Sequence, residues 1–191
     1  MKKYLVIGNP IEHSFSPKLH NYWIKNNNIN AVYEKQKLNE NEIERLILEV
    51  KEKKINGINV TVPFKKAVIP FLDRLSLEAE STKSVNTIYL DNGKLVGHNT
   101  DISGFELGMK NSKFKVIGKK ILILGAGGVV PSIIFALNKM RASSITVSNR
   151  TKHKVESLKS YFNNIIIADW GEVPEFDMII NATSLGLNKD D

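Results

Sequence analysis

The sequence predicts an α/β protein made of two consecutive domains, with a boundary near residue 101. Short apolar segments of strand length alternate with amphipathic helical segments, which is the pattern of βαβ units with parallel strands. A glycine-rich turn near residue 125 joins an apolar strand to an apolar helix, an arrangement typical of nucleotide-binding α/β domains. A length of 191 residues allows one large domain or two small ones.

The first half starts with an apolar strand at residues 4–8. A helix is expected from Pro17, with Ser16 as its N-cap, because serine is favoured at the N-cap and proline at the first helical position. Alternation of apolar and polar residues then predicts a strand over residues 31–38.

An amphipathic helix is expected over residues 39–54, because apolar side chains recur there at helical spacing. The elements predicted after it are a strand over 57–62, a short helix opened by Pro63, a short helix over 75–81, and strands over 85–89 and 94–97. Asp91-Asn92-Gly93 lies between the last two strands and is a strong hairpin signal.

The second half alternates helix and strand more regularly, which indicates a parallel sheet. Its predicted elements are a helix over 101–111, a loop over 113–120, strands over 120–124, 144–148, 165–168 and 178–181, and helices over 130–140 and 152–162.

Composition excludes several classes of protein. The chain has no cysteine, which removes disulfides, thiolate nucleophiles and cysteine-based zinc sites, and no metal site is expected. Its net charge of +7 is spread evenly, with 15 basic and 11 acidic residues up to residue 100 and 12 and 9 after it, so no nucleic-acid partner is expected. Glycines and a proline interrupt the longest apolar run, and no signal peptide precedes the first strand. We therefore expect a soluble, cytoplasmic protein without a membrane partner.

The glycine-rich turn predicts a dinucleotide site. Glycines allow a pyrophosphate to approach the backbone closely, and the following helix N-terminus offers N–H groups and a positive dipole. Val130 occupies the place of the usual third glycine, and a tight turn without a ligand is the alternative. The expected cofactor contacts in this turn are Gly125, Ala126, Gly127, Gly128 and Val129.

The segment after the next strand favours NADP over NAD. NAD-binding proteins usually place a carboxylate there for the ribose hydroxyls, whereas this chain has Asn149, Arg150 and Thr151, with Lys154 close behind. A guanidinium can clamp a 2′-phosphate or stack on adenine. The alternative for Arg150 is a solvated residue at a helix start.

Polar residues of the first half predict a substrate cleft. Alternation places Asn59 and Thr61 on one face of a strand, and an asparagine is costly to bury unpaired, so both are expected to face a cleft. Lys65 follows in the first turn of the expected Pro63 helix, where the helix dipole would lower its pKa and favour proton exchange with a substrate hydroxyl. Lys66 is expected to be a plain surface lysine.

Three further residues carry the same expectation. Asp101 lies at the domain boundary and could orient a hydroxylated substrate, although a helix N-cap is the alternative. Ser14 and Ser16 could bind a carboxylate through their hydroxyls and a helix N-terminus, with ordinary capping as the alternative.

Together these segments resemble the shikimate dehydrogenase family over nearly the whole chain and in order. The motifs that carry the resemblance are Gly8-Asn9-Pro10-Ile11-Glu12-His13-Ser14-Phe15-Ser16-Pro17 with His20-Asn21, Asn59-Val60-Thr61-Val62-Pro63-Phe64-Lys65, Val85-Asn86-Thr87, Gly97-His98-Asn99-Thr100-Asp101, Gly125-Ala126-Gly127-Gly128, Asn149-Arg150-Thr151 and Asn181-Ala182-Thr183-Ser184-Leu185-Gly186.

The resemblance implies reversible, NADPH-linked reduction of 3-dehydroshikimate to shikimate in aromatic amino-acid biosynthesis. It implies that Ser14 and Ser16 bind the substrate carboxylate and that Thr61, Asn86 and Asp101 surround the ring hydroxyls. Lys65 matches the family's catalytic lysine and Asp101 its catalytic partner. The implied fold is a substrate domain over residues 1–101 followed by a Rossmann-type NADP domain over residues 102–191.

The sequence departs from the family pattern in two places. Val129-Val130-Pro131 replaces smaller residues and a basic residue, which would weaken one phosphate contact. The chain ends at Asp191, where the family normally continues, so the cofactor domain is expected to be incomplete. Alternatives are a quinate/shikimate dehydrogenase using NAD or NADP, an inactive nucleotide-binding fragment, and an unrelated Rossmann dehydrogenase of the methylene-tetrahydrofolate type. Either a monomer or a homodimer is expected.

Overall fold

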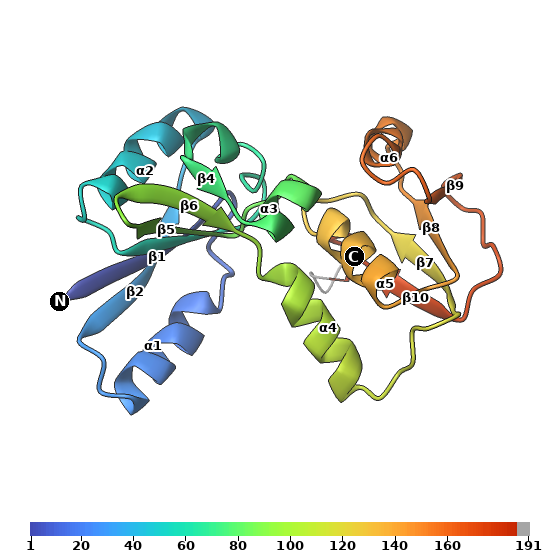
Figure 1. Cartoon of the computed structure of the whole chain (residues 1–191), viewed down its shortest axis with the longest axis horizontal. Helices are drawn as coiled ribbons and strands as arrows, with labels where there is room; N and C mark the ends of the chain where they lie inside the picture. The colour runs from blue at the N-terminus through green and yellow to red at the C-terminus, as the bar shows by residue number, and fades with distance from the viewer. Residues whose placement is uncertain (187–191) are drawn as a thin grey trace. The chain divides into compact units, whose positions relative to one another are not determined.

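The computed structural model describes residues 1–186, and the chain divides into two compact units (Figure 1). The first unit comprises residues 1–100, and the second begins at Asp101. Each unit has a β-sheet of its own. The division falls next to the boundary expected from the change in sequence pattern at residue 101.

The first unit is built on a six-stranded mixed sheet in the order β2-β1-β3-β5-β6-β4. β1 pairs in parallel with β2 and β3, whereas β5 pairs in antiparallel with β3 and β6. The positive φ angles of Asn92 (48°) and Gly93 (76°) make the tight turn between β5 and β6, as the hairpin signal predicts. The strands are β1 (Lys2–Gly8), β2 (Ala31–Lys37), β3 (Gly57–Val60), β4 (Arg74–Leu75), β5 (Thr87–Asp91) and β6 (Lys94–His98).

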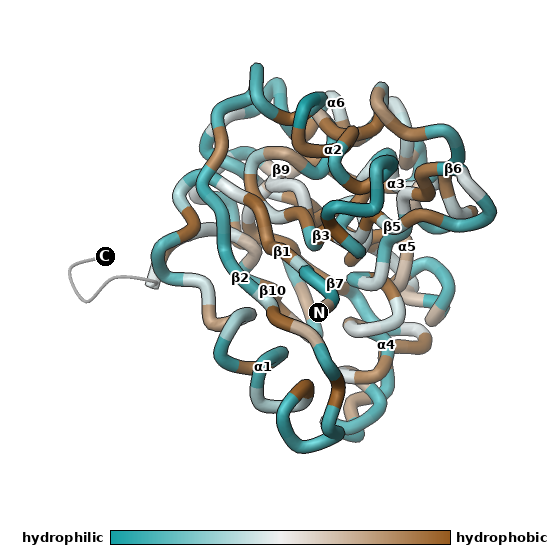
Figure 2. The backbone as a smooth tube through the Cα atoms, turned by 90° about the vertical axis from the view of Figure 1, so that its left-hand side faces the viewer, coloured by the Kyte–Doolittle hydropathy of each residue, from teal (hydrophilic) through white to brown (hydrophobic). Residues whose placement is uncertain are grey.

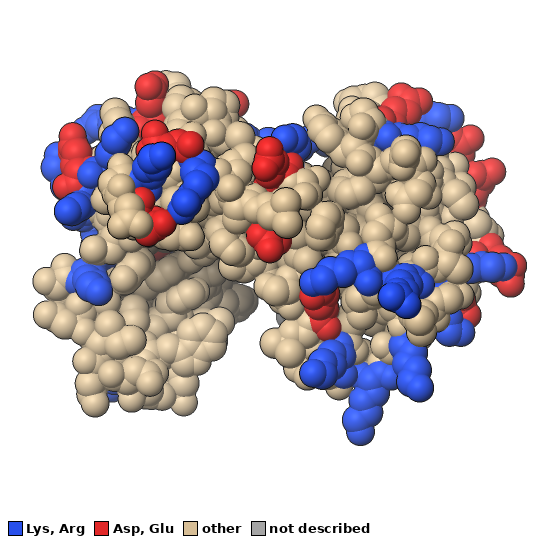
Figure 3. All heavy atoms as spheres, viewed as in Figure 1, with Lys and Arg blue, Asp and Glu red and all other residues tan. Residues whose placement is uncertain are grey.

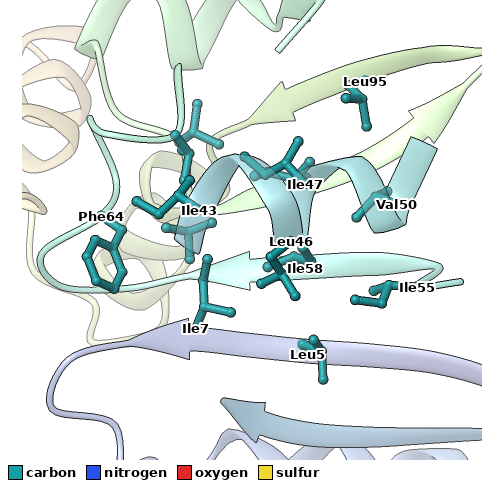
Figure 4. Packing of buried hydrophobic residues seen from close by; sticks show 14 of the residues in the cluster. Leu5, Ile7, Ile43, Leu46, Ile47, Val50, Ile55, Ile58, Phe64 and Leu95 are labelled. Carbon is teal, nitrogen blue, oxygen red and sulfur yellow. The ribbon is translucent and has the colours of Figure 1, made fainter. Parts of the chain in front are cut away.

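Helix α2 (Ile43–Lys51) covers one face of this sheet and supplies much of its core. Its four buried residues recur at helical spacing and pack on alternate residues of the central strands, such as Leu5 and Ile7 of β1 (Figure 4). The cluster also contains Phe64 and residues of β3, β5 and β6. The four residues of α2 are Ile43, Leu46, Ile47 and Val50.

Helix α1 (Ser16–Asn26) covers the opposite face and packs less completely, since none of its residues is fully buried. Val6, Ile11 and Tyr33 form a small cluster on this face, with Ile24 of α1 beside them. The view in Figure 3 has few charged side chains over α1. The large apolar side chains that remain exposed there are Phe15, Leu19, Tyr22 and Trp23.

Three local expectations for this unit are wrong. The helix expected from Pro63 does not form: residues 62–68 make turns, and a 3₁₀ helix, η2 (Ile69–Phe71), follows. Pro63 and Pro70 leave too short a segment between them, and Pro70 has no N–H for a helical hydrogen bond. The N-cap of α1 is Phe15, so Ser16 lies within the helix. The long helix expected over residues 39–54 is instead a 3₁₀ turn, η1 (Glu40–Glu42), followed by the shorter α2. The remaining helix of the unit is α3 (Leu77–Thr82).

The second unit has a four-stranded parallel sheet in the order β10-β7-β8-β9. Alternate residues of β7 and β8 enter one apolar cluster with three helices. This Rossmann-like arrangement confirms the α/β fold class. In the first unit, Figure 2 shows the tube at β1 in the brown of hydrophobic residues. None of the helices within residues 1–186 has the length and apolarity needed to cross a membrane. The elements are α4 (Asp101–Asn111), β7 (Lys120–Leu124), α5 (Val130–Lys139), β8 (Ser144–Ser148), α6 (Lys152–Lys159), β9 (Ile166–Ala168) and β10 (Met178–Asn181).

Candidate active site

Strand directions bring the polar residues of the first unit to a single edge of its sheet. β1 and β3 are parallel, so the loops that follow them leave the sheet at the same edge. β5 runs in antiparallel to β3 and starts at this edge, and β6 ends there. Ligands of α/β sheets bind outside such carboxyl ends. The predicted site residues that directly follow β1 or β3, or precede β5, are Ser14, Ser16, Thr61, Lys65 and Asn86.

The two serines lie where the loop after β1 enters helix α1. The Ser14 hydroxyl accepts a hydrogen bond from the Ser16 backbone N–H at 3.3 Å. Both side chains are half-buried. Ser14 thus fixes the entry into the helix, and both hydroxyls lie at its N-terminal end, where an anion is favoured.

The segment after β3 is held tightly against the end of β1. The Thr61 N–H donates to the Ile7 carbonyl at 2.9 Å, and the Asn9 N–H donates to the Val62 carbonyl at 3.0 Å. Gly8 is required at this contact, because a Cβ added there would lie 2.7 Å from Thr61 Cγ2. Thr61 is therefore positioned by backbone contacts.

Lys65 lies in the turns that follow and is 9% exposed. Its carbonyl accepts a hydrogen bond of 2.9 Å from the Val85 N–H, which ties it to the segment that leads into β5. No helix begins before it, so the helix dipole cannot be the source of its chemistry. Its burial singles it out instead, because lysines are rarely buried in proteins and then usually have a partner for the ammonium group.

Asn59 is half-buried, and both ends of its carboxamide are engaged. Its Oδ1 accepts a hydrogen bond of 2.7 Å from the Tyr33 hydroxyl, and its Nδ2 donates to Thr87 Oγ1 at 3.1 Å. The same nitrogen lies 3.3 Å from the Asn86 carbonyl oxygen. An asparagine in mid-strand is here satisfied by protein groups.

Asn86 belongs to the same hydrogen-bond network and is held by Thr87 and Thr100. Its Oδ1 accepts hydrogen bonds from Thr87 Oγ1 at 2.9 Å and from the Thr100 N–H at 3.0 Å. Its Nδ2 donates to Thr100 Oγ1 at 2.9 Å. Asp101 follows Thr100 directly and is the first residue of α4 in the second unit. Asn99, by contrast, is 1% exposed and donates inward to Thr82 and to the Ser84 carbonyl.

Sequence reasoning missed Tyr33, and it gave Thr87 and Thr100 no individual role. Tyr33 appears in the sequence as one more residue of an alternating strand. Its link to Asn59 depends on β1 lying between β2 and β3, which no local pattern indicates.

Close backbone contacts build the glycine-rich turn of the second unit. Gly125 has a φ of +111°, and a Cβ there would lie 2.7 Å from the Ala182 carbonyl oxygen. The Gly125 N–H donates to the Ser148 carbonyl, and the Ala182 N–H donates to the Leu124 carbonyl, both at 2.8 Å. The carboxyl ends of β7, β8 and β10 therefore meet at Gly125, and only glycine fits there.

The rest of the turn leads into helix α5, with Gly127 exposed at the surface. Val129 is the N-cap of α5, and Val130 opens the helix and is fully buried. Pro131, in the first turn, has no N–H to offer a ligand. The turn thus provides the open backbone and helix N-terminus that a dinucleotide pyrophosphate requires, with one donor fewer than usual.

The loop after β8 carries basic residues beside the same sheet edge. Lys152 is paired with Asp169 at 2.7 Å. Arg150 and Lys154 are exposed, and neither has an ion pair within residues 1–186. Asn149 Nδ2 donates to the Thr151 carbonyl at 2.9 Å, which shapes the loop. Thr151 is the N-cap of α6, although its side chain makes no capping hydrogen bond. These residues fit an anionic 2′-phosphate better than free ribose hydroxyls.

The described part of the chain contains no group of three or more histidine and acidic side chains that could hold a metal ion.

The fold and the residues at its sheet edges define a dinucleotide-dependent oxidoreductase. The chain is 58% identical over 190 residues to shikimate dehydrogenase (NADP(+)) from Pelagibacter ubique (strain HTCC1062), with all of this chain and 72% of that protein covered. The chain belongs to the shikimate dehydrogenase family.

Family models and solved structures agree with this assignment. Residues 6–88 match the shikimate dehydrogenase substrate binding domain, and residues 107–186 match shikimate / quinate 5-dehydrogenase. The structure of shikimate dehydrogenase from Aquifex aeolicus is similar, with a TM-score of 0.91 and 39% identity, covering 100% of this chain and 72% of that one. So is that of shikimate 5-dehydrogenase from Thermus thermophilus in complex with NADP(H) and shikimate, with a TM-score of 0.88 and 30% identity, covering 98% and 70%.

Proposed function

We propose that this protein catalyses the reversible, NADPH-dependent reduction of 3-dehydroshikimate to shikimate in aromatic amino-acid biosynthesis. Lys65 is the observation that carries the proposal: it is the only buried lysine among residues 1–186, and it follows Thr61 at the sheet edge where Asn86 also lies. A buried ammonium is a proton source whose position is fixed, as proton transfer to a carbonyl oxygen requires.

The first unit binds the substrate. The hydroxyls of Ser14 and Ser16 hold the carboxylate at the start of α1, and Thr61 and Asn86 hydrogen-bond ring hydroxyls. Asp101 matches the family's catalytic aspartate and follows Thr100, which is hydrogen-bonded to Asn86. Asn59 supports this site through Asn86 and Thr87, because its own carboxamide is already engaged.

Lys65 moves the proton of the reaction. During reduction, the Nζ ammonium gives a proton to the carbonyl oxygen, which becomes the new hydroxyl. During oxidation, the neutral amine takes the proton back. Asp101 matches the residue that serves as the catalytic partner of this lysine in the family.

The second unit binds the cofactor at the carboxyl ends of β7 and β8. Residues 125–129 would receive the pyrophosphate, and Arg150 and Lys154, with Asn149 and Thr151 beside them, would hold the 2′-phosphate. When bound, NADPH supplies the hydride that reduces the substrate carbonyl carbon. The cytoplasmic location and the choice between monomer and homodimer remain predictions.

The test is a steady-state assay of cofactor reduction with shikimate or quinate, each with NADP⁺ or NAD⁺. The highest kcat/KM is expected for shikimate with NADP⁺. A higher value with NAD⁺ would contradict the role of Arg150 and Lys154, and a higher value with quinate would contradict the substrate assignment. If the cofactor were reduced at the same rate without shikimate or quinate, the proposed function would be wrong.

A further inference from the structure

The side chain of Tyr33, on strand β2, reaches across β1 to the candidate substrate site on β3 and β5. β2 is an edge strand, and β1 separates it from β3. Tyr33 pairs with Tyr4 of β1, and Asn59 pairs with Val6 two residues further along. This register places Tyr33 and Asn59 on the same face of the sheet, and the 2.7 Å hydrogen bond between them spans β1.

Helix α1 holds Tyr33 in place. Both backbone groups of Tyr33 on the open edge of β2 are bonded to the Asn21 side chain: the carbonyl accepts from Nδ2 at 2.7 Å, and the N–H donates to Oδ1 at 3.0 Å. The His20 ring stacks on the tyrosine ring, with centroids 4.1 Å apart and planes 4° from parallel. Tyr33 is 4% exposed, so its hydroxyl has little freedom to move.

The hydrogen bonds beyond Tyr33 form a chain with one direction. The tyrosine O–H donates to Asn59 Oδ1, Asn59 Nδ2 donates to Thr87 Oγ1, and Thr87 Oγ1 donates to Asn86 Oδ1. Burial raises the pKa of Tyr33 above its ordinary value, so the phenol stays protonated and donates. Without that donor Asn59 Oδ1 loses its hydrogen-bond partner, and the side chain that positions Thr87 is held only by the bonds of its Nδ2 to Thr87 Oγ1 and to the Asn86 carbonyl.

We propose that Tyr33 is a positioning residue for shikimate: acting through Asn59 and Thr87, its hydroxyl holds in place the Asn86 carboxamide that binds the substrate, together with the bonds that Asn86 makes to Thr100. This inference rests on the proposed function, because it takes Asn86 as a substrate ligand.

The test compares Tyr33→Phe with Tyr4→Phe. Both substitutions remove one phenol hydroxyl from the same face of the sheet, and the Tyr4 hydroxyl has no hydrogen bond within the described residues. Tyr33→Phe is expected to raise the KM and the calorimetric Kd for shikimate about threefold to tenfold, the usual effect of one lost hydrogen bond. The KM for NADP⁺ is expected to change less than about twofold, and Tyr4→Phe to leave all of these values unchanged.

A purely structural role would give a different result. Loss of folded enzyme lowers the apparent kcat and leaves both KM values unchanged. Equal shikimate affinities in the two variants, or equal rises in the KM for shikimate and NADP⁺ in Tyr33→Phe, would overturn the proposal.

Thr87→Val interrupts the chain further along and provides a second route to the test. It is expected to weaken shikimate binding by itself, and Tyr33→Phe is expected to add no further loss in that background. Additive losses would overturn the route through Thr87. Wild-type protein that binds shikimate but does not oxidise it would contradict the proposed function alone, since the Kd comparison would still decide the role of Tyr33.

Discussion

The two units build their candidate sites by different means. In the first unit, side chains of three strands and of the residue before β5 bond to one another, in the chain from Tyr33 of β2 through Asn59 of β3 and Thr87 of β5 to Asn86. In the second unit, three strand ends meet through backbone groups at Gly125. Arg150 and Lys154 supply the side chains proposed to bind the cofactor there. Both sites lie at carboxyl ends of parallel strands. The topology of the sheet thus determines the location of a site, but not whether side chains or backbone groups form it.

This difference predicts different sensitivities to substitution. A side-chain network loses one hydrogen bond at a time and should weaken in steps. A close backbone approach has no room for one additional carbon and should fail at once.

The largest effect is expected for Lys65→Ala, which removes the proposed proton donor and leaves the backbone contact to Val85 in place. We expect kcat to fall by about 10²–10⁴-fold, the usual contribution of general acid–base catalysis, with a smaller change in shikimate Kd. Steady-state kinetics and calorimetry give the two numbers.

Lys66→Ala is the matched control, since Lys66 is the exposed neighbour and has no assigned role. If both variants retained the turnover of the wild type, Lys65 would not be the proton donor.

Gly125→Ala should produce the next largest effect, measured as the free energy of unfolding. The added Cβ meets the Ala182 carbonyl oxygen at 2.7 Å on a backbone with φ +111°. Such strain and overpacking cost about 2–4 kcal/mol. In Gly127→Ala the nearest atom to the Cβ is 3.9 Å away, so a change below about 1 kcal/mol is expected. Equal losses in the two variants, measured by denaturant unfolding, would contradict the close approach as the cause.

The smallest effect is expected from the titration of His20 in the first unit. Burial lowers its pKa below the ordinary value of about 6.5, so the folded state favours the neutral ring. The free energy of unfolding therefore carries no penalty from His20 above pH about 6.5. It decreases as the pH falls from there toward the pKa of His20 in the folded state, because the unfolded chain binds more protons than the folded chain in this range.

Thermal unfolding of the wild type and of His20→Phe should show this. Phenylalanine keeps a ring beside Tyr33 but cannot titrate, so the variant should lose less stability than the wild type on acidification from pH about 8 to about 5.5. The same loss in both proteins would assign the acid sensitivity to other groups.

Much of the fold follows from local sequence signals. Alternating apolar residues, the stripe on α2 and the Asn92-Gly93 turn each have one favoured structure. The Pro63 segment was predicted incorrectly because its structure depends on two prolines acting together, and the expected dipole effect on Lys65 failed with it.

Parts of the candidate site depend on strand pairing that no local signal reports. Gly125 is an obligatory glycine because the chain returns past it at Ala182, far along the sequence. Tyr33 contacts Asn59 because β1 is inserted between their strands. The residues at strand ends could be anticipated from the sequence, whereas the groups that hold them required the sheet order.

The most direct test of this division between the units is a crossed measurement of both KM values in Asn86→Ala and Arg150→Ala. We predict a KM for shikimate raised about tenfold or more in Asn86→Ala, with the KM for NADP⁺ nearly unchanged, and the reverse in Arg150→Ala. A rise in both KM values by the same factor in either variant would contradict this division.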